Sequence, residues 1–142
     1  MKTLFTALAI TALSVSQSGS GSIAGSWTAE FEGQTFIRLE INTANGLISG
    51  GLSLGRFEVD QRGVVRRADP APRDLKPIFD VTIKGSTVTF LRKDGHDTDQ
   101  FELRLLENAN ADLHFLLNDG DRTELAASGV PVPKPIRLKK AG

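Results

Sequence analysis

The segment Asp94–Asp99 holds the densest group of side chains that could do chemistry. It reads Asp-Gly-His-Asp-Thr-Asp, and carboxylate and imidazole groups are ligands that divalent cations accept. Its spacing does not fit the calcium-loop pattern, in which alternating acids precede a glycine and a distant glutamate completes the site. We interpret the segment as the polar tip of a hairpin. An enzyme that uses a metal ion at this cluster is a weaker alternative.

Few other residues could support catalysis. His96 and His114 are the two histidines of the chain, and His114 lies between two apolar residues, so strand alternation directs it away from a core. The chain has no cysteine, no Gly-x-Ser-x-Gly and no His-Glu-x-x-His motif. Glu30 and Glu32 fall on a predicted outer face, where water leaves carboxylates weak as general acids. We therefore predict no catalytic residue, no cofactor and no metal site, and expect that the protein is not an enzyme.

Length and charge narrow the class of protein further. The 142 residues suit one domain, and 17 basic residues balance 17 acidic ones. A chain without excess positive charge has no means of holding a phosphate backbone along its surface, so we expect no nucleic-acid partner.

The first residues are typical of an export signal. Lys2 precedes the apolar run Leu4–Leu13, and small residues follow at Ser14–Ser16. This pattern predicts a signal peptide over 1–16 that is cleaved before Gln17, and a flexible Gly/Ser leader over 17–22. The apolar run is too short for a permanent membrane span and no second one follows, so we expect a periplasmic or secreted protein without a transmembrane span.

Alternation of apolar and polar residues dominates the rest of the chain. Apolar residues recur at every second position, and Gly-, Asn- or Asp-containing turns separate the runs. An open sheet of eight or nine such strands would expose two edges, so we predict an all-β fold: a single antiparallel up-and-down β-barrel of about eight strands over residues 23–129. The expected strands include Phe57–Val59, Phe79–Ile83, and a last one around Leu125 and Ala127.

Two segments interrupt this rhythm. Residues 61–77 contain three prolines and five basic residues and are long for a hairpin connection, so they predict either a solvated loop or a lid near a binding site. Residues 130–142 form a Pro-rich basic tail, which could strap across the barrel through Ile136 and Leu138 or remain free.

The start of the first predicted strand resembles a known family. Gly25-Ser26-Trp27 is similar to the Gly-x-Trp signature of the calycin superfamily, which includes lipocalins, fatty-acid-binding proteins and avidins. The segment 23–55 resembles the first three strands of avidins, and Thr98-Asp99 and Arg137 are similar to lipocalin positions. The resemblance implies a barrel whose closed end is plugged by the indole. Biotin binding is not implied, because avidin sites use several tryptophans and a tyrosine, and this chain has one tryptophan and no tyrosine.

A barrel without catalytic groups can bind a ligand in its interior. Our hypothesis is an exported lipocalin-like barrel that binds a small apolar ligand, with the 61–77 loop near the entrance. The alternative is a non-enzymatic interaction module with a filled core, which engages a protein or an envelope component through the Pro-rich tail or the 61–77 loop. The predicted binding residues all belong to the inward-facing set: Trp27, Phe31, Leu39, Phe57, Phe79, Val81, Phe90, Phe101, Leu103 and Phe115.

Overall fold

A closed barrel of eight antiparallel strands forms the body of the protein. The structure is a computed structural model and describes residues 23–141, so the predicted signal peptide and leader lie outside the described residues. The barrel strands are β1 (Gly25–Phe31), β2 (Gln34–Ala44), β3 (Leu47–Leu54), β6 (Lys76–Lys84), β7 (Thr87–Asp94), β8 (Asp97–Leu105), β9 (Asn110–Leu116) and β10 (Ile136–Lys140). This confirms the predicted fold class.

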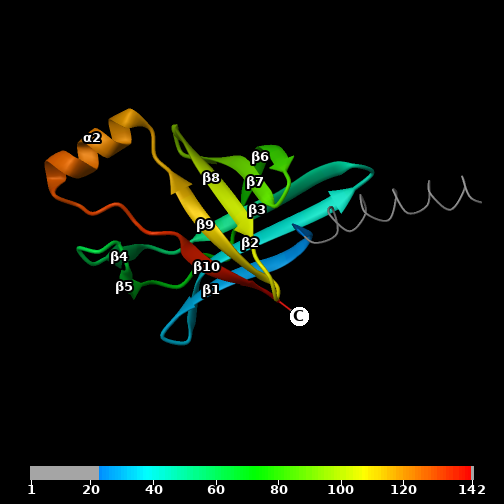
Figure 1. The fold of residues 1–142 in the computed structure, drawn as a ribbon, viewed down its shortest axis with the longest axis horizontal. Coiled ribbons are helices and arrows are strands. Elements are labelled where there is room, and N and C mark those ends of the chain that lie inside the picture. The colour runs from blue at the N-terminus through cyan, green and yellow to red at the C-terminus, as the bar shows by residue number, and fades with distance from the viewer. Residues whose placement is uncertain (1–22, 142) are drawn as a thin grey trace, which may run out of the picture.

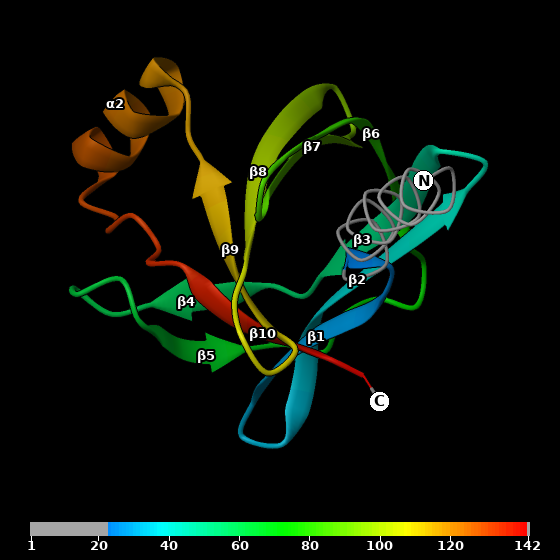
Figure 2. The same cartoon turned by 45° about the vertical axis from the view of Figure 1, so that its right-hand side comes forward.

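The barrel strands follow one another around the wall in chain order. Each of the eight pairs antiparallel with its neighbours, and β10 closes the barrel by pairing with both β9 and β1 (Figure 1). Three other elements lie outside the wall: the hairpin of β4 (Phe57–Val59) and β5 (Val65–Ala68), and the helix α2 (Asp119–Ser128). In both ribbon views this hairpin and α2 extend from the same end of the barrel (Figure 2).

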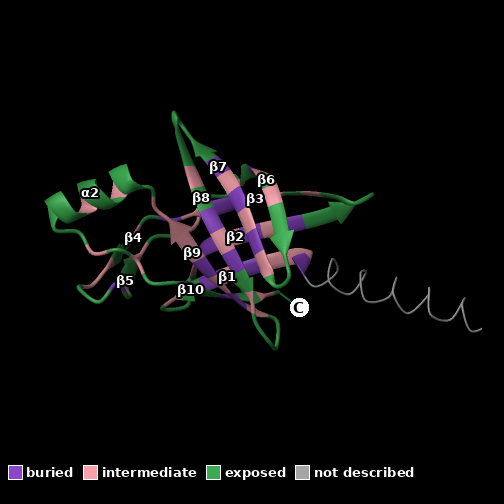
Figure 3. Ribbon diagram, turned by 45° about the horizontal axis from the view of Figure 1, so that its top comes forward, coloured by how far each residue is buried: buried purple, intermediate pink, exposed green. Residues whose placement is uncertain are grey.

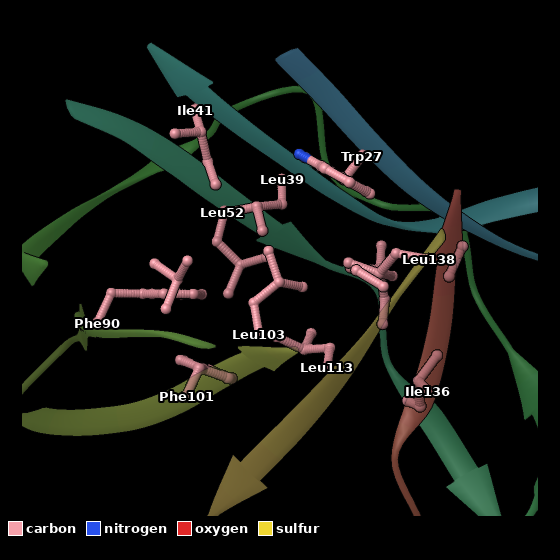
Figure 4. Close-up of a cluster of buried hydrophobic side chains, with 14 of the residues drawn as sticks. Trp27, Leu39, Ile41, Leu52, Phe90, Phe101, Leu103, Leu113, Ile136 and Leu138 are labelled. Carbon is pink, nitrogen blue, oxygen red and sulfur yellow. The ribbon is translucent and has the colours of Figure 1, made fainter. Parts of the chain in front are cut away.

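The core fills the barrel between its strands. Side chains from β1, β2, β3, β7, β8, β9 and β10 converge on one apolar cluster, in which Trp27 is 2% exposed and Leu39, Leu52 and Leu138 are fully buried (Figure 4). Buried residues concentrate on the barrel strands, whereas α2 is exposed or intermediate along its length (Figure 3). Two-residue periodicity thus identified the strand faces that form the core.

Two β-bulges shift the alternation from its expected phase. Between Ala29 and Glu30 the register with β2 slips by one residue, so that Phe36 and Ile37 are both buried. The second bulge lies in β6 at Asp80, whose φ is 50°. Because of it, Phe79 pairs with Leu91, which lies between two buried residues of β7 and therefore points outward. The inward position predicted for Phe79 was wrong.

The connection over 61–77 is mostly structured. Its β5 strand pairs with β4, so Phe57–Val59 belongs to a separate hairpin and not to the barrel wall as expected. In the turn between these strands, hydrogen bonds from the backbone N–H of Val64 (3.0 Å) and of Arg62 (2.8 Å) hold the pKa of Asp60 below its ordinary value.

The return from β5 to β6 is fixed to the barrel wall by hydrogen bonds. The backbone N–H of Ala71 donates to the carbonyl of Thr35 at 3.0 Å. The Arg38 guanidinium donates to the carbonyl of Arg73 at 2.8 Å, and the Ser53 hydroxyl donates to a carbonyl of the same segment. Residues 61–77 are therefore not one open loop. They contain the turn and the second strand of the β4–β5 hairpin, followed by a short segment that is hydrogen-bonded to the barrel wall.

The last predicted strand is a helix. Residues around Leu125 lie in α2, where Asn118 caps the N-terminus by accepting a hydrogen bond from the Asp121 N–H at 2.7 Å. Gly129 ends the helix with a φ of 71°, a left-handed conformation that glycine adopts without strain. Asn118–Asp121 forms the start of this helix. The strand prediction failed because Leu125 and Ala127, with Ala126 between them, span too few positions to separate the two periods.

The tail completes the barrel. Ile136 and Leu138 point into the core, and β10 occupies the place between β9 and β1 that the strand near Leu125 was expected to fill. The barrel therefore extends beyond the predicted boundary at residue 129. Of the tail, residues 130–135 form the connection from α2 to this last strand.

Candidate binding site at the open end of the barrel

The two ends of the barrel differ in how they are closed. At one end, three direct hairpins join β2 to β3, β6 to β7 and β8 to β9, and the Trp27 indole lies beneath them with its Nε1–H donating to the carbonyl of Ile23 at 2.9 Å. We call this the Trp27 end. At the opposite end, the β4–β5 hairpin, α2 and residues 130–135 leave the wall. We call it the open end.

A cavity of about 300 Å³ lies at the open end. Leu54 from the end of β3 lines it together with Phe101 from β8 and Phe115 from β9. Polar residues line it as well, among them Asp99 and Asp121. Small-molecule sites combine apolar surface with a few polar groups, and their volumes begin near this size.

A second, mostly apolar groove of about 440 Å³ adjoins this cavity. It runs between the β4–β5 hairpin on one side and α2 with the Pro-rich connection on the other. Phe115 and Leu117 line both spaces. The other residues that line the groove are Phe57, Glu58, Val59, Arg66, Leu125, Gly129, Val130, Pro131 and Pro133.

A row of aromatic rings runs from the core to these spaces. Phe90 stacks on Phe101 at 5.4 Å between centroids, and Phe101 meets the edge of Phe115 at 5.4 Å. Phe115 then contacts Phe57 at 5.6 Å, which contacts Phe36 at 5.8 Å. Such tilted and offset pairs are favourable ring geometries, and three rings of this row, Phe57, Phe101 and Phe115, line the open-end site.

The predicted binding residues divide into three groups. Phe57, Phe101 and Phe115 line the open-end cavities. Trp27, Leu39, Phe90 and Leu103 are buried against one another in the filled core, and Val81 packs at its margin. Phe31 lines a separate groove beside the β4–β5 hairpin, and Phe79 lies on the outer face.

Several lining residues escaped the sequence reasoning. Leu54, Leu117 and Leu125 were placed on strands but not in the site, and Val130 was placed in the tail. The helix-capping signals of Asn118 and Gly129 could have revealed that the chain turns back over the barrel end here.

One buried charge stands beside the cavity. Arg92 is 7% exposed and points inward from β7, with its Nη2 3.3 Å from Asp99 Oδ2 and 3.9 Å from Asp94 Oδ2. Its Cζ lies 5.6 Å from the ring centroid of Phe101, a cation–π distance. Phe101 of the cavity wall is therefore backed by a buried arginine with two carboxylate partners.

The Asp94–Asp99 segment is a hairpin tip, as interpreted from the sequence. Asp94 pairs with Asp97 at the end of the β7–β8 ladder, and Gly95 takes a positive φ of 67° in the turn. Within residues 23–141, no three His, Asp or Glu side chains gather in a way that could hold a metal ion. Within the same residues, the helix α2 is too short and too polar to cross a membrane.

Comparisons with protein-family models, with curated proteins and with solved structures give no match to this chain. The calycin resemblance therefore remains an interpretation of Gly25-Ser26-Trp27 and of the barrel. The Trp27 ring of this motif is buried in the core, and the Lys140 Nζ lies 5.7 Å from its centroid.

Proposed function

We propose that this protein is an exported barrel that binds a small, largely apolar molecule at its open end. The observation that carries the proposal is the contrast between the two ends. At the Trp27 end the indole is buried beneath three direct hairpins, and the space of about 310 Å³ there lies at the tip of the β2–β3 hairpin beside Ile83, whereas at the open end two adjoining spaces of about 300 and 440 Å³ share Phe115 and Leu117. Apolar surface held around a concave space is a typical ligand site.

The ligand site that we propose lies at the mouth of the barrel and not in its interior, where the sequence-based hypothesis placed it. Trp27, Leu39 and Leu103 already fill the interior with one another, so a ligand there would have to displace a packed core. Phe115 and Leu117 are partly exposed and already face open space. Binding at the mouth buries apolar surface without unpacking the core.

Export and family are supported by sequence features. Lys2 and the apolar run Leu4–Leu13 support export, which N-terminal sequencing of the protein recovered from its host would test by finding Gln17 as the first residue. The Gly25-Ser26-Trp27 motif on the first strand of an eight-stranded meander supports a calycin-like barrel.

A fluorescence titration tests the binding site directly. N-phenyl-1-naphthylamine is neutral and apolar and gains fluorescence when it leaves water, so the protein should enhance its emission in a saturable way. Leu117→Lys places an ammonium group in the lining of both spaces. It should raise the dissociation constant of the probe about tenfold or more, because the bound probe would remove water from this charge.

Leu47→Lys is the matched control. Leu47 is 74% exposed in the β2–β3 hairpin at the Trp27 end, so the same substitution there should change probe binding less than about twofold. Absence of saturable enhancement with the unmodified protein would contradict the proposal, as would equal loss of binding in the two variants.

A further inference from the structure

Arg92 carries a buried hydrogen-bond donor that the protein itself does not satisfy. Its side chain is more than nine-tenths buried, and its contacts with Asp94 and Asp99 both involve Nη2. The Nε–H is also buried and has no acceptor within hydrogen-bonding distance among residues 23–141. Buried polar groups in folded proteins nearly always have a partner, so each exception calls for an explanation.

The Arg92 side chain lies directly behind two residues that line the open-end cavity. Asp99 and Phe101, the two residues that contact the Arg92 guanidinium from β8, both line that cavity. Asp99 is the movable part of this wall, because its carboxylate is partly exposed and its hydrogen bond to Arg92 is long at 3.3 Å. An acceptor that enters between Asp99 and the Phe101 ring reaches the guanidinium.

The charges around the cavity select the kind of acceptor. Asp94 and Asp99 already face the buried Arg92 guanidinium, and Asp121 lines the cavity together with Asp99, so carboxylates outnumber this buried cation. An anionic head group would meet this excess negative charge, and an ammonium group has no lone pair to accept the Nε–H. A neutral carbonyl oxygen accepts the hydrogen bond without adding charge.

From these observations we infer that the molecule bound at the open end carries a carbonyl oxygen, as in a ketone, ester or amide, and that Arg92 recognises it. This inference rests on the proposed function and adds a ligand class to it. The carbonyl oxygen accepts the hydrogen bond from Nε–H, while the apolar body of the ligand contacts Phe101 and Phe115.

A matched series of naphthalene compounds tests the inference by displacing N-phenyl-1-naphthylamine from the full protein. 2-Acetylnaphthalene and 2-ethylnaphthalene have nearly the same shape and differ in the carbonyl oxygen. We expect the ketone to bind about 5- to 10-fold more tightly than the ethyl compound, the range of one net hydrogen bond. It should also bind more tightly than 2-naphthoate and 2-naphthylmethylamine.

Substitution of the arginine should remove this preference alone. Arg92→Met should bind the ketone and the ethyl compound within about twofold of each other, whereas the control Arg104→Met, at an exposed outer-face arginine paired with Glu102, should keep the preference. If Arg92→Met does not fold, the ¹⁵N–¹H resonance of the Arg92 Nε–H in the unmodified protein gives the same information. It should shift with 2-acetylnaphthalene and not with 2-ethylnaphthalene.

The outcomes separate this inference from the proposed function. Equal binding of the ketone and the ethyl compound, or tighter binding of the carboxylate or the amine, overturns the role of Arg92 while open-end binding stands. Failure of every compound to displace the probe, or failure of the probe itself to bind, overturns both.

Discussion

Replacing Trp27 with phenylalanine should destabilise the barrel by about 2 to 4 kcal/mol. The indole Nε1–H donates to the carbonyl of Ile23 at 2.9 Å, and Ile23 and Trp27 are both buried. Phenylalanine leaves that carbonyl without its donor, which costs about 1 to 3 kcal/mol. The smaller ring also leaves a void in a packed core, which adds about 1 kcal/mol or more.

Urea unfolding followed by far-UV circular dichroism measures the change, because this signal does not depend on the tryptophan that is removed. The slope against urea should stay the same while the midpoint falls. Leu47→Ala, at a 74% exposed position, provides the control and should stay within about 0.5 kcal/mol of the unmodified protein. A Trp27→Phe variant no less stable than this control would refute the assignment of the indole as the buried plug of the barrel end.

Three further perturbations address other elements. Leu138→Ala should cost about 2 to 5 kcal/mol of unfolding free energy in urea titrations, because Leu138 is fully buried in the closing strand, whereas Val132→Ala, 51% exposed in the connection before it, should cost less than about 0.5. Asn118→Ala should reduce the helical circular dichroism signal through loss of a cap worth about 1 kcal/mol, yet leave the urea midpoint of the barrel unchanged, because α2 buries no residue; a lowered midpoint would contradict this. The pKa of Asp60 is lowered chiefly by the hydrogen bond from the Val64 N–H. The ionised carboxylate therefore stabilises the β4–β5 turn fully at pH values above the ordinary pKa of aspartate. This stabilisation is lost as the pH falls through the lowered pKa of the folded protein. Hydrogen exchange at Val64 should therefore speed up on acidification relative to an Asp60→Asn variant, and equal pH dependence in both proteins would contradict it.

Alternation in the sequence was sufficient to predict the barrel wall. Ile37, Leu39 and Ile41 on β2, and Phe101 and Leu103 on β8, are buried as the two-residue period requires. The argument from exposed sheet edges then led to closure. Which strand closes the barrel could not be predicted in this way, because the short apolar pattern of Ile136 and Leu138 follows several prolines and is no stronger than the pattern around Leu125.

The candidate site was less predictable than the wall. Bulges move a residue from one face to the other, and an aspartate such as Asp80 does not by itself predict one: it adopts a positive φ more readily than most residues, yet most aspartates do not. The lining residues Leu117 and Val130 lie outside the strands of the structure, and their positions depend on tertiary folding over the barrel end. Arg92 illustrates the same limit, because alternation places it inward but cannot indicate which acceptors it will lack.

The position of the site follows from the topology of the meander. In an up-and-down barrel, successive connections alternate between the two ends, so the inserted hairpin between β3 and β6 and the inserted helix between β9 and β10 both fall at the same end. The three connections between paired strands at the Trp27 end are short, which lets the core close beneath them. Any apolar surface on the inserted segments must then gather around the opposite mouth, where Phe57 of the hairpin and Leu125 of the helix line one groove. A binding function at that mouth could change through these insertions while the wall and its Trp27 plug stay the same.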